Sequence, residues 1–585
     1  MYQTPFLSLD DLERAVQLLS EVGVHDVRYE LAWGKPDALD FAQAKPHPVF
    51  AMVDRLSAAL KKNDITPMLV MGYCPNPLKS RAVWEAWKDL PNNLDEWQAI
   101  TRAYAEHLRD NDGVSAPFYE VWNEPDLSLG NPPVKVFFMG GPADYGSLYH
   151  HAAAGIKRGD SDSLVGGPAI AWQTEYFKAL LDSGAPVDFA SIHSYANFPV
   201  QLGLMRQTIH SSPNEDLHDT LPIFLTEYAS YESFTADGPN SRYPAAARFF
   251  RDVNGLLQET DTPKVYWAQW VDDDLGFLTF HFKKKALFNA LRIYATMLPV
   301  DRCPVIPDGV GGVGVMAAAD DHQAGVALWN ENDHDSDVAV ELHHIPFAAG
   351  TLELYRIDRS HASYLDNPNS EELVELSAEP VVGYAASWTG SLPAQSVLFL
   401  RCIDGSGASL LRPSRIGTYV RSLYAFPDRT GDSYADFDPR TSIARLGIGS
   451  RDRGQAQIGV VIDNPVKPIL AQVRQEGPFR QLDANSVFGI RIDYANNRGH
   501  YSRSVMLYGG AIYSPHRTGK FYWGAGGPAA AHSRSIPEMM NGRLFDIDVH
   551  GLAPNDWNRR RVILTFMMQG VGAGSRARFS LIPAR

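Results

Sequence analysis

The sequence predicts an α/β protein: a (β/α)8 TIM barrel followed by a β-sandwich accessory domain and an additional C-terminal all-β module. In the first 300 residues, short β-like runs alternate with amphipathic helical stretches, a pattern typical of a parallel sheet built from βα units. From about Pro299 the pattern changes to short alternating apolar runs separated by turn residues, which predicts antiparallel sheets. At 585 residues the chain is also too long for one hydrophobic core, so several domains are expected.

Seven strands are predicted in the barrel region, with helical patterns between most of them. The strands are expected at 24–31, 66–73, 117–123, 163–168, 187–195, 221–227 and 264–270. The helices are expected at 9–22, 49–62, 94–110, 143–157, 174–182, 243–260 and 285–297. An eight-stranded barrel needs one strand more. The opening residues MYQTPFLS make a poor barrel strand, so the sequence leaves the origin of the missing strand open.

Three domains are predicted from these changes of pattern. The barrel is assigned to residues 1–298, the β-sandwich to 299–404 and the C-terminal β module to 405–585. Runs such as AGVALWNEN, GTLELYRID and QSVLFLRC have the alternation that is typical of sandwich strands. The stretch GSGAS at 405–409 is typical of a flexible linker before the last domain.

Composition excludes several classes of protein. The 45% apolar and 21% charged residues are typical of a soluble globular chain, and no apolar run approaches the roughly 20 residues of a membrane span. The N-terminus has no signal-peptide pattern, so the compartment stays open between the cytoplasm and, if a signal was removed, the periplasm or the exterior. For Cys74, Cys303 and Cys402, buried thiols are favoured over a single bridge between the last two.

The C-terminal module is basic, whereas the rest of the chain is acidic. Residues 405–585 hold 24 Lys and Arg against 13 Asp and Glu, a net charge of +11, and the remainder holds 29 against 55, a net charge of −26. The module is either a carbohydrate-binding domain for an acidic polysaccharide or an arginine-rich sandwich docked on the barrel or on another subunit of a homo-oligomer. Nucleic acid is not expected as a partner, because the arginines are scattered singly.

The stretch FYEVWNEPDL, residues 118–127, places an acid at the end of a predicted strand. Glu124 ends this strand and Glu227 ends the strand in LPIFLTEYAS, and active sites of parallel barrels lie at the carboxyl ends of strands. Two facing carboxylates are what glycoside hydrolysis needs, one as proton donor and the other as nucleophile or base. Asn123 suits a donor to the sugar 2-hydroxyl. The alternative is that each glutamate caps a helix or pairs with an arginine.

Further candidate substrate-binding residues lie near other strand ends. His193 and Tyr195, in IHSYAN, are expected to bind sugar hydroxyls, and the alternative for His193 is a core histidine. Trp270 is either a platform for a sugar ring or a packing residue, and Arg28 is expected to orient the nucleophile carboxylate. The acidic run at 272–274 is interpreted as a solvated loop or helix cap, because no second cluster of ligands accompanies it. Neither a metal nor another cofactor is expected.

Several stretches together resemble glycoside hydrolase family 39, which includes β-xylosidases and α-L-iduronidases. EVWNEPDL and FLTEY are similar to the acid/base and nucleophile segments of the retaining clan that contains this family. SLYHHAAAGIKRGDSDSLVGGPA, VDFASIHSYAN, KKKALFNALRIYATM and LYRIDRSHASYLDN extend the resemblance over about residues 10–402. It implies a retaining mechanism with Glu124 as acid/base and Glu227 as nucleophile, no cofactor, and a missing strand that is the first of the barrel.

One residue departs from the family pattern. Where the β-xylosidases usually have a histidine two residues after an arginine, this chain has Glu30, which adds an acceptor for a sugar hydroxyl. The resemblance favours an exo-acting, β-xylosidase-like enzyme whose substrate is an oligosaccharide or polysaccharide. The alternatives are an endo-acting glycosidase on a bacterial or plant polysaccharide, an α-L-iduronidase-like enzyme and, outside enzymes, a glycan-binding barrel without catalysis.

Overall fold

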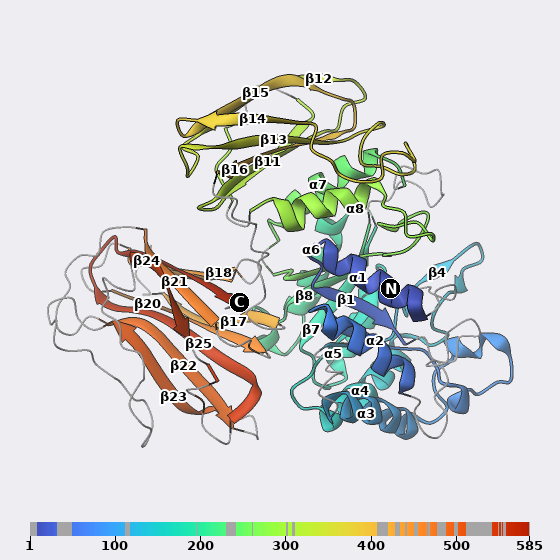
Figure 1. The fold of residues 1–585 in the computed structure, drawn as a ribbon. Helices are drawn as coiled ribbons and strands as arrows, with labels where there is room; N and C mark the ends of the chain where they lie inside the picture. The colour runs from blue at the N-terminus through green and yellow to red at the C-terminus, as the bar shows by residue number, and fades with distance from the viewer. Residues whose placement is uncertain are drawn as a thin grey trace. The chain divides into compact units, whose positions relative to one another are not determined.

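The computed structural model contains all 585 residues, which fall into two compact units, Met1–Leu410 and Leu411–Arg585 (Figure 1). In the first unit the structure describes residues 9–31, 50–110, 118–195, 197–229, 241–259, 261–299, 302–306 and 311–405. In the second unit it describes residues 419–427, 433–438, 442–449, 454–463, 465, 469–476, 487–496, 501–509, 541–547, 549–550, 553 and 557–583.

A parallel sheet forms the barrel of the first unit. In the described residues it has seven strands, paired in chain order as β1-β2-β3-β6-β7-β8-β9. The strands are β1 Asp26–Glu30, β2 Thr66–Met71, β3 Phe118–Val121, β6 Leu164–Ile170, β7 Phe189–Ser194, β8 Ile223–Tyr228 and β9 Lys264–Trp267. β3 and β6 are buried along their whole length, as expected of a parallel sheet that is covered on both faces. All seven strands that the sequence predicts are present.

The two ends of this sheet, β1 and β9, come together and nearly close the barrel. Lys264 Nζ, on β9, donates to both carboxylate oxygens of Asp26, on β1, at 3.0 Å. The ion pair joins the first and last strands of the described sheet. The segment MYQTPFLS, considered above for the missing strand, lies outside the described residues.

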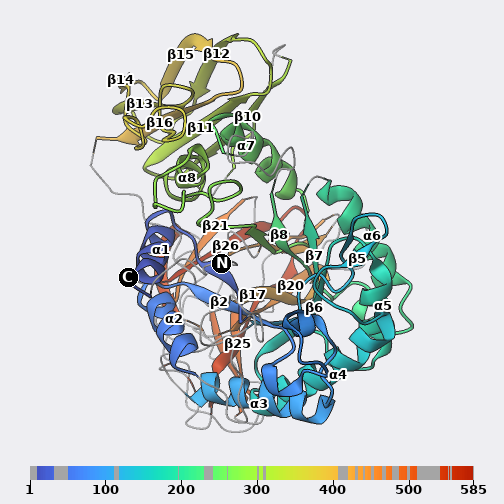
Figure 2. The same ribbon diagram turned by 90° about the vertical axis from the view of Figure 1, so that its right-hand side faces the viewer.

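Helices follow the strands, and Figure 2 shows α1 to α6 around them. The α-helices are α1 Leu9–Glu21, α2 Ala51–Lys62, α3 Leu94–Asp110, α4 Pro142–Gly159, α5 Thr174–Asp182, α6 Phe198–His210, α7 Pro244–Leu256 and α8 Ala286–Arg292. Short helical turns are η2 Asn76–Leu78, η3 Trp84–Lys88, η4 Glu215–Leu217 and the π-helical η5 Ile293–Met297. The sequence did not predict α6, because Pro199 and Gly203 weaken its helical pattern. Pro199 lies in the first turn, where its missing N–H costs little.

A β-sandwich completes the first unit. Its sheets are β10 Val313–Ala319, β11 Gln323–Asn330, β16 Val397–Asp404, β13 Ala349–Ile357 and β14 Ser377–Val382 in that order, and β12 Ser336–His343 with β15 Ala385–Leu392. The sandwich lies next to α7 and α8 (Figures 1 and 2). Asn289 of α8 donates through Nδ2 to the backbone oxygens of Ala362 at 2.9 Å and Glu371 at 3.0 Å. A two-stranded hairpin, β4 Ser128–Leu129 with β5 Val134–Lys135, follows β3.

The second unit is all-β, as predicted. One sheet has the order β17 Tyr419–Pro427, β20 Gly454–Asp463, β25 Trp557–Val571, β22 Val487–Asn496 and β23 Tyr501–Gly509. The other has the order β18 Tyr434–Asp438, β19 Ile443–Gly447, β26 Arg576–Pro583, β21 Ile469–Gln475 and β24 Asn541–Ile547. Phe579 of the second sheet packs against Phe488 and Phe566 of the first, with ring centroids 5.2 and 4.9 Å apart. The two sheets therefore face each other across a shared apolar core.

None of the three cysteines forms a disulfide, so the bridge considered between the last two is absent; Cys74 and Cys402 are buried and Cys303 is partly exposed. In the described part of the chain, we find no helix whose length and apolar character would let it cross a membrane.

Candidate active site

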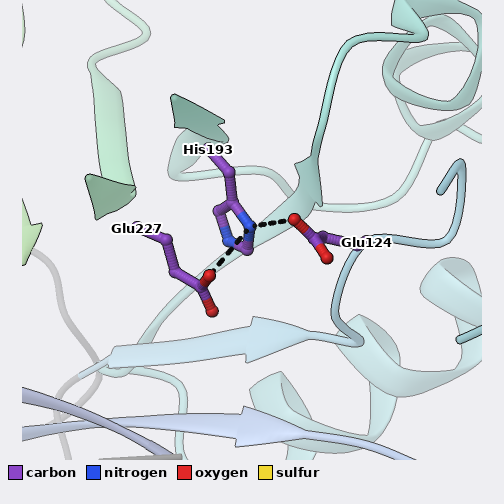
Figure 3. Close-up of side chains that lie close together, drawn as sticks. All are labelled: Glu124, His193 and Glu227. Atoms are coloured by element: carbon purple, nitrogen blue, oxygen red, sulfur yellow. Dashed lines mark hydrogen bonds and ion pairs between the residues drawn. The ribbon is translucent and has the colours of Figure 1, made fainter. Parts of the chain in front are cut away.

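Three side chains from neighbouring parts of the sheet meet at the carboxyl end of the barrel (Figure 3). Glu124 follows β3, His193 belongs to β7 and Glu227 to β8. The His193 imidazole lies between the two carboxylates, with Nδ1 2.9 Å from Glu124 Oε1 and 3.5 Å from Glu227 Oε2. One oxygen of each carboxylate and one ring nitrogen lie within 4.8 Å of one another. The two carboxylates therefore lie close enough together to act on one glycosidic bond.

The backbone that presents Glu124 is strained. β3 ends at Val121, and φ is +69° at Trp122 and +40° at Glu124, left-handed values that cost roughly 1 kcal/mol or more for residues with a side chain. Trp122 N donates to Met71 O of β2 and Glu124 N donates to Ala169 O of β6, both at 3.1 Å. The adjacent strands thus hold the turn on both sides. Strain of this kind persists where the surrounding structure fixes it, and it is typical of functional sites.

Asp126 anchors the segment that follows Glu124. It is fully buried, and its carboxylate accepts backbone N–H groups from Ala171 at 2.9 Å, Trp172 at 2.9 Å and Gln173 at 2.8 Å. The side chain of Gln173 donates back to Asp126 O at 2.8 Å. Because α5 begins at Thr174, the carboxylate also lies at the N-terminus of that helix, where a negative charge is favoured. The loops after β3 and β6 are thereby joined beside Glu124.

The guanidinium of Arg28, from β1, donates hydrogen bonds to three partners. Nε donates to Glu120 Oε2 at 2.6 Å, Nη1 to Glu227 Oε1 at 2.8 Å and Nη2 to Asn123 Oδ1 at 2.7 Å. Arg28, Glu120 and Asn123 are buried, so these charge-assisted hydrogen bonds are shielded from water. Burial disfavours the charged guanidinium, but Glu120, Glu227 and Glu30 outweigh it, and the pKa of Arg28 is raised above its ordinary value.

The two candidate catalytic carboxyls have pKa values displaced in opposite directions. Burial raises the pKa of Glu124, and the nearby charge of Glu227 adds to this effect. Burial acts on Glu227 in the same sense, but His193, Arg28 and the Tyr195 hydroxyl outweigh it, so the pKa of Glu227 is lowered. Burial disfavours the imidazolium of His193, yet the two glutamates raise the pKa of His193. At equal pH, Glu124 is therefore the more protonated carboxyl of the pair.

Three further residues that the sequence singled out lie around this pair. The side-chain oxygen of Asn123 accepts a hydrogen bond from Arg28, and within the described residues its amide nitrogen makes no hydrogen bond. The Tyr195 hydroxyl donates to Glu227 Oε2 at 2.5 Å. Glu30 is buried, and the Tyr73 hydroxyl lies 3.3 Å from both of its carboxylate oxygens. Residues two apart on a strand face the same way, so Glu30 shares the side of β1 that presents Arg28.

Trp270 is buried and contacts α1 and α8. β9 ends at Trp267, and Trp270 is 6% exposed with its Nε1 donating to Ala15 O of α1 at 2.9 Å. Its ring packs against Phe277 and Phe288, with centroids 5.5 and 5.9 Å away. Of the two interpretations, these contacts favour packing over a sugar platform.

Sequence reasoning missed two residues of this arrangement, Glu120 and Asp126. Both belong to the stretch FYEVWNEPD, and both are completely buried. An acidic residue inside a buried strand requires a partner, and that requirement was the available signal. The partner of Glu120 is Arg28, 92 positions away, which the local pattern does not reveal.

The donor set of Glu124, His193 and Glu227 also has a spacing that suits a metal ion. Its composition, one imidazole nitrogen and two carboxylate oxygens, is one that zinc accepts. Arg28 Nη1 lies 2.8 Å from Glu227 and already supplies a positive charge there. A second cation is disfavoured beside it, so the geometry fits proton transfer and nucleophilic attack better than metal binding.

Comparison with known proteins gives a consistent picture. The family model of glycosyl hydrolases family 39 matches residues 20–342, more than half of the chain. A β-xylosidase from Caldicellulosiruptor saccharolyticus is 25% identical over 363 residues, which cover 57% of this chain and 71% of the relative. A β-xylosidase from Geobacillus stearothermophilus is 26% identical over 298 residues, covering 43% of this chain and 57% of the relative.

Solved structures agree on the fold. A family 39 enzyme from Xanthomonas axonopodis pv. citri superimposes with a TM-score of 0.55 at 18% identity, covering 68% of this chain and 91% of the other. At that identity the likeness concerns the fold alone. Together with the family match, which includes both strand ends carrying Glu124 and Glu227, it gives one conclusion: the chain belongs to glycosyl hydrolases family 39 and is a glycosidase.

Proposed function

We propose that the chain is a retaining glycosidase in which Glu227 is the nucleophile and Glu124 the acid/base residue. The observation that carries this proposal is the pair of carboxylates on either side of His193, with pKa values displaced in opposite directions. A protonated carboxyl suits the proton donor and an ionised one the nucleophile. One oxygen of Glu124 lies within 4.8 Å of one oxygen of Glu227. This is nearer to the carboxyl separation of about 5–5.5 Å in retaining enzymes than to the roughly 6.5–9.5 Å in inverting ones, and it supports retention.

In the first half of the reaction, a Glu227 oxygen attacks the anomeric carbon. The bond from that carbon to the leaving oxygen breaks, and Glu124 gives its proton to this oxygen. A glycosyl ester on Glu227, a free leaving group and an ionised Glu124 result. Arg28 and Tyr195, which donate to different oxygens of Glu227, keep the carboxylate oriented for attack. The amide nitrogen of Asn123 suits the sugar 2-hydroxyl.

In the second half, the ionised Glu124 takes a proton from water while the water oxygen attacks the anomeric carbon. The ester bond breaks, Glu227 departs as a carboxylate, and the sugar leaves with its original configuration. His193 Nδ1, 2.9 Å from Glu124, stabilises the ionised acid/base residue during this half. Glu124 regains its proton, so the cycle closes without a cofactor.

The charges around the site support a neutral sugar, with a β-xyloside acted on from its end as the first candidate. The relatives called β-xylosidases point to xylose. A uronic acid would meet the buried Glu30 carboxylate, and Arg28 is already engaged by three partners. Arg242, just before α7, is engaged as well: it donates to Leu365 O at 2.8 Å and lies 3.6 Å from the carboxylate of Asp366. These contacts disfavour an α-L-iduronidase-like specificity.

A panel of aryl glycosides tests the proposal. The panel holds the β-xyloside, α-L-arabinoside, β-galactoside, β-glucoside and α-L-iduronide, and NMR reads the first-formed anomer. We expect turnover of a neutral glycoside with retained configuration. Glu227→Gln abolishes it, whereas the same change at the exposed Glu175 leaves it unchanged. First-formed inverted product would refute the role of Glu227. Turnover of xylan fragments alone would instead support the endo-acting alternative.

A further inference from the structure

The loops after β3 and β6 form a wall beside Glu124, and many contacts hold these two loops together. Glu124 N bonds Ala169 O, and the Asp126 carboxylate accepts three backbone N–H groups of the loop after β6. Farther out, Lys135 Nζ donates to the Tyr176 hydroxyl at 2.7 Å, and that hydroxyl lies 3.1 Å from Gly140 O. The segment from Glu124 to Gly140 is thus attached to the start of α5 at several points. The backbone of this wall therefore has a fixed position relative to Glu124.

Trp172 lies in this wall with its indole open to solvent. Its backbone N–H is one of the three that Asp126 accepts, yet its side chain is 49% exposed. Among the tryptophans whose side chains the structure describes, Trp172 is the one that is exposed. Leu129, Val134 and Met139, on the attached segment, are also at least half exposed. An exposed indole offers apolar surface whose burial by a ligand is favourable.

We propose that Trp172 is the platform for the sugar ring on the leaving-group side of the scissile bond. This inference rests on the proposed roles of Glu124 and Glu227. The acid/base residue must contact the leaving oxygen, so the leaving sugar lies on the side of Glu124 and away from Glu227. Trp172 is attached to the segment after Glu124, and β6 lies directly beside β3 in the sheet. The loop that carries Trp172 therefore lies on the Glu124 side of the carboxylate pair, the side on which the leaving sugar is expected.

The chemistry of the indole fits a pyranose. Its face packs on the apolar C–H face of the sugar, and its N–H donates to a hydroxyl. Within the described part of the chain, Trp172 Nε1 makes no hydrogen bond, so this donor is available. The substrate class that follows is an oligosaccharide with a second pyranose next to the released sugar, not a glycoside with a small alkyl group.

Two substrates separate this role from the chemistry at the released sugar. In β-1,4-xylobiose the leaving group is a pyranose, whereas in β-xylosyl fluoride it is a single atom that needs neither a platform nor much acid assistance. We expect Trp172→Ala to lower kcat/KM for xylobiose about tenfold or more and to leave the fluoride unchanged. The kcat/KM of Trp172→Phe for xylobiose should lie between those of Trp172→Ala and the unaltered enzyme. Tyr384→Ala serves as the control, because Tyr384 is a 56% exposed aromatic residue of the sandwich. It should leave kcat/KM unchanged for both substrates.

A second readout uses the glycosyl intermediate. Added xylose or xylobiose competes with water for this intermediate by binding where the leaving sugar bound, so Trp172→Ala lowers the fraction of transfer products. Equal losses of kcat/KM on both substrates, or no loss on xylobiose, would overturn the platform while leaving the glycosidase proposal intact. If the aryl-glycoside panel names another sugar, the matching disaccharide and fluoride replace the xylose pair. An unaltered enzyme that hydrolyses no member of the panel, no disaccharide and no fluoride would refute the proposed function itself.

Discussion

Arg28 and Tyr195 separate the protonation states of the two candidate catalytic glutamates. Burial raises the pKa of both carboxyls, and His193 lowers both, so neither effect distinguishes them. Of the two candidate catalytic glutamates, Glu227 is the one that accepts hydrogen bonds from the guanidinium of Arg28 and the hydroxyl of Tyr195. One carboxylate therefore has two additional donors at 2.8 and 2.5 Å, and the other has none of them. This asymmetry supports the proposed roles, with Glu227 ionised as the nucleophile and Glu124 protonated as the acid.

The pH profile of kcat/KM should show these two displacements. The proposed mechanism requires Glu227 ionised and Glu124 protonated, so the expected profile is bell-shaped and reports the coupled pair. The acidic limb lies below the ordinary glutamate value of 4.5, because the pKa of Glu227 is lowered, and the basic limb lies above it. With the glycosyl fluoride, which needs little acid assistance, Glu124→Gln should remove the basic limb and keep the acidic one. A basic limb that survives this substitution would assign it to another group.

The same displacements predict opposite effects of two substitutions on stability. A carboxyl whose pKa is raised by folding binds more protons in the folded state, so the free energy of unfolding falls as pH rises from the ordinary value of 4.5 through the raised value. Glu124→Gln removes this loss and should stabilise the protein at pH 7, by an amount on the order of 1 kcal/mol. The folded-state pKa of Glu227 is lowered, so its charge stabilises the protein above the unfolded-state pKa and Glu227→Gln destabilises it there. Urea unfolding at pH 7 and near pH 3 checks both, and the difference for Glu124→Gln should vanish at the acidic pH.

At the scale of elements, the loops after β3 and β6 behave as one piece because Asp126 joins them. Asp126→Ala leaves the N–H groups of Ala171, Trp172 and Gln173 without their carboxylate. We expect the free energy of unfolding to fall by about 3 kcal/mol, since hydrogen bonds to a buried charge are strong. Asp126→Asn keeps one acceptor oxygen and should lose less. If Trp172 is the platform, kcat/KM for xylobiose also falls more than that for the fluoride, and equal stability of the two variants would contradict the anchoring role.

The parts of the fold and the candidate site that the sequence predicted are those whose pattern lies within a short stretch of the chain. The barrel strands repeat a buried β-like run at a regular spacing, and Glu124 and Glu227 end two of these runs, so both features are visible in short windows. Glu120 gives no such signal, because the Arg28 that explains it is 92 positions away. Trp270 was taken for a strand end because its apolar run continues past Trp267, where pairing in β9 stops. α6 was missed because Pro199 and Gly203 mask a helix that tertiary packing stabilises.

At the scale of the whole molecule, the apolar core of the barrel continues into the sandwich. One buried cluster includes Phe250 of α7 together with Trp329 of β11 and Phe399 of β16. The rings of Phe250 and Trp329 stack with centroids 6.1 Å apart. The C-terminal unit has a separate buried cluster of its own, which includes Phe488 and Phe579. Cooperative unfolding follows shared cores, so the barrel and the sandwich should melt together, and the C-terminal unit on its own.

Truncation at two positions tests this division. A chain that ends at Leu410 keeps the shared core of the first unit whole, and we expect it to fold and to hydrolyse the aryl glycoside within about twofold of the full chain. A chain that ends at Leu298 loses Trp329 and Phe399 and uncovers the apolar faces of α7 and α8, so it should aggregate or melt far lower, since each large core side chain contributes about 3–5 kcal/mol. Calorimetry of the full chain should show a transition that the chain ending at Leu410 retains and a second that it lacks. A Leu410 truncation without activity on the small substrate would mean that the C-terminal unit supports catalysis directly, and the division into independent cores would then be wrong.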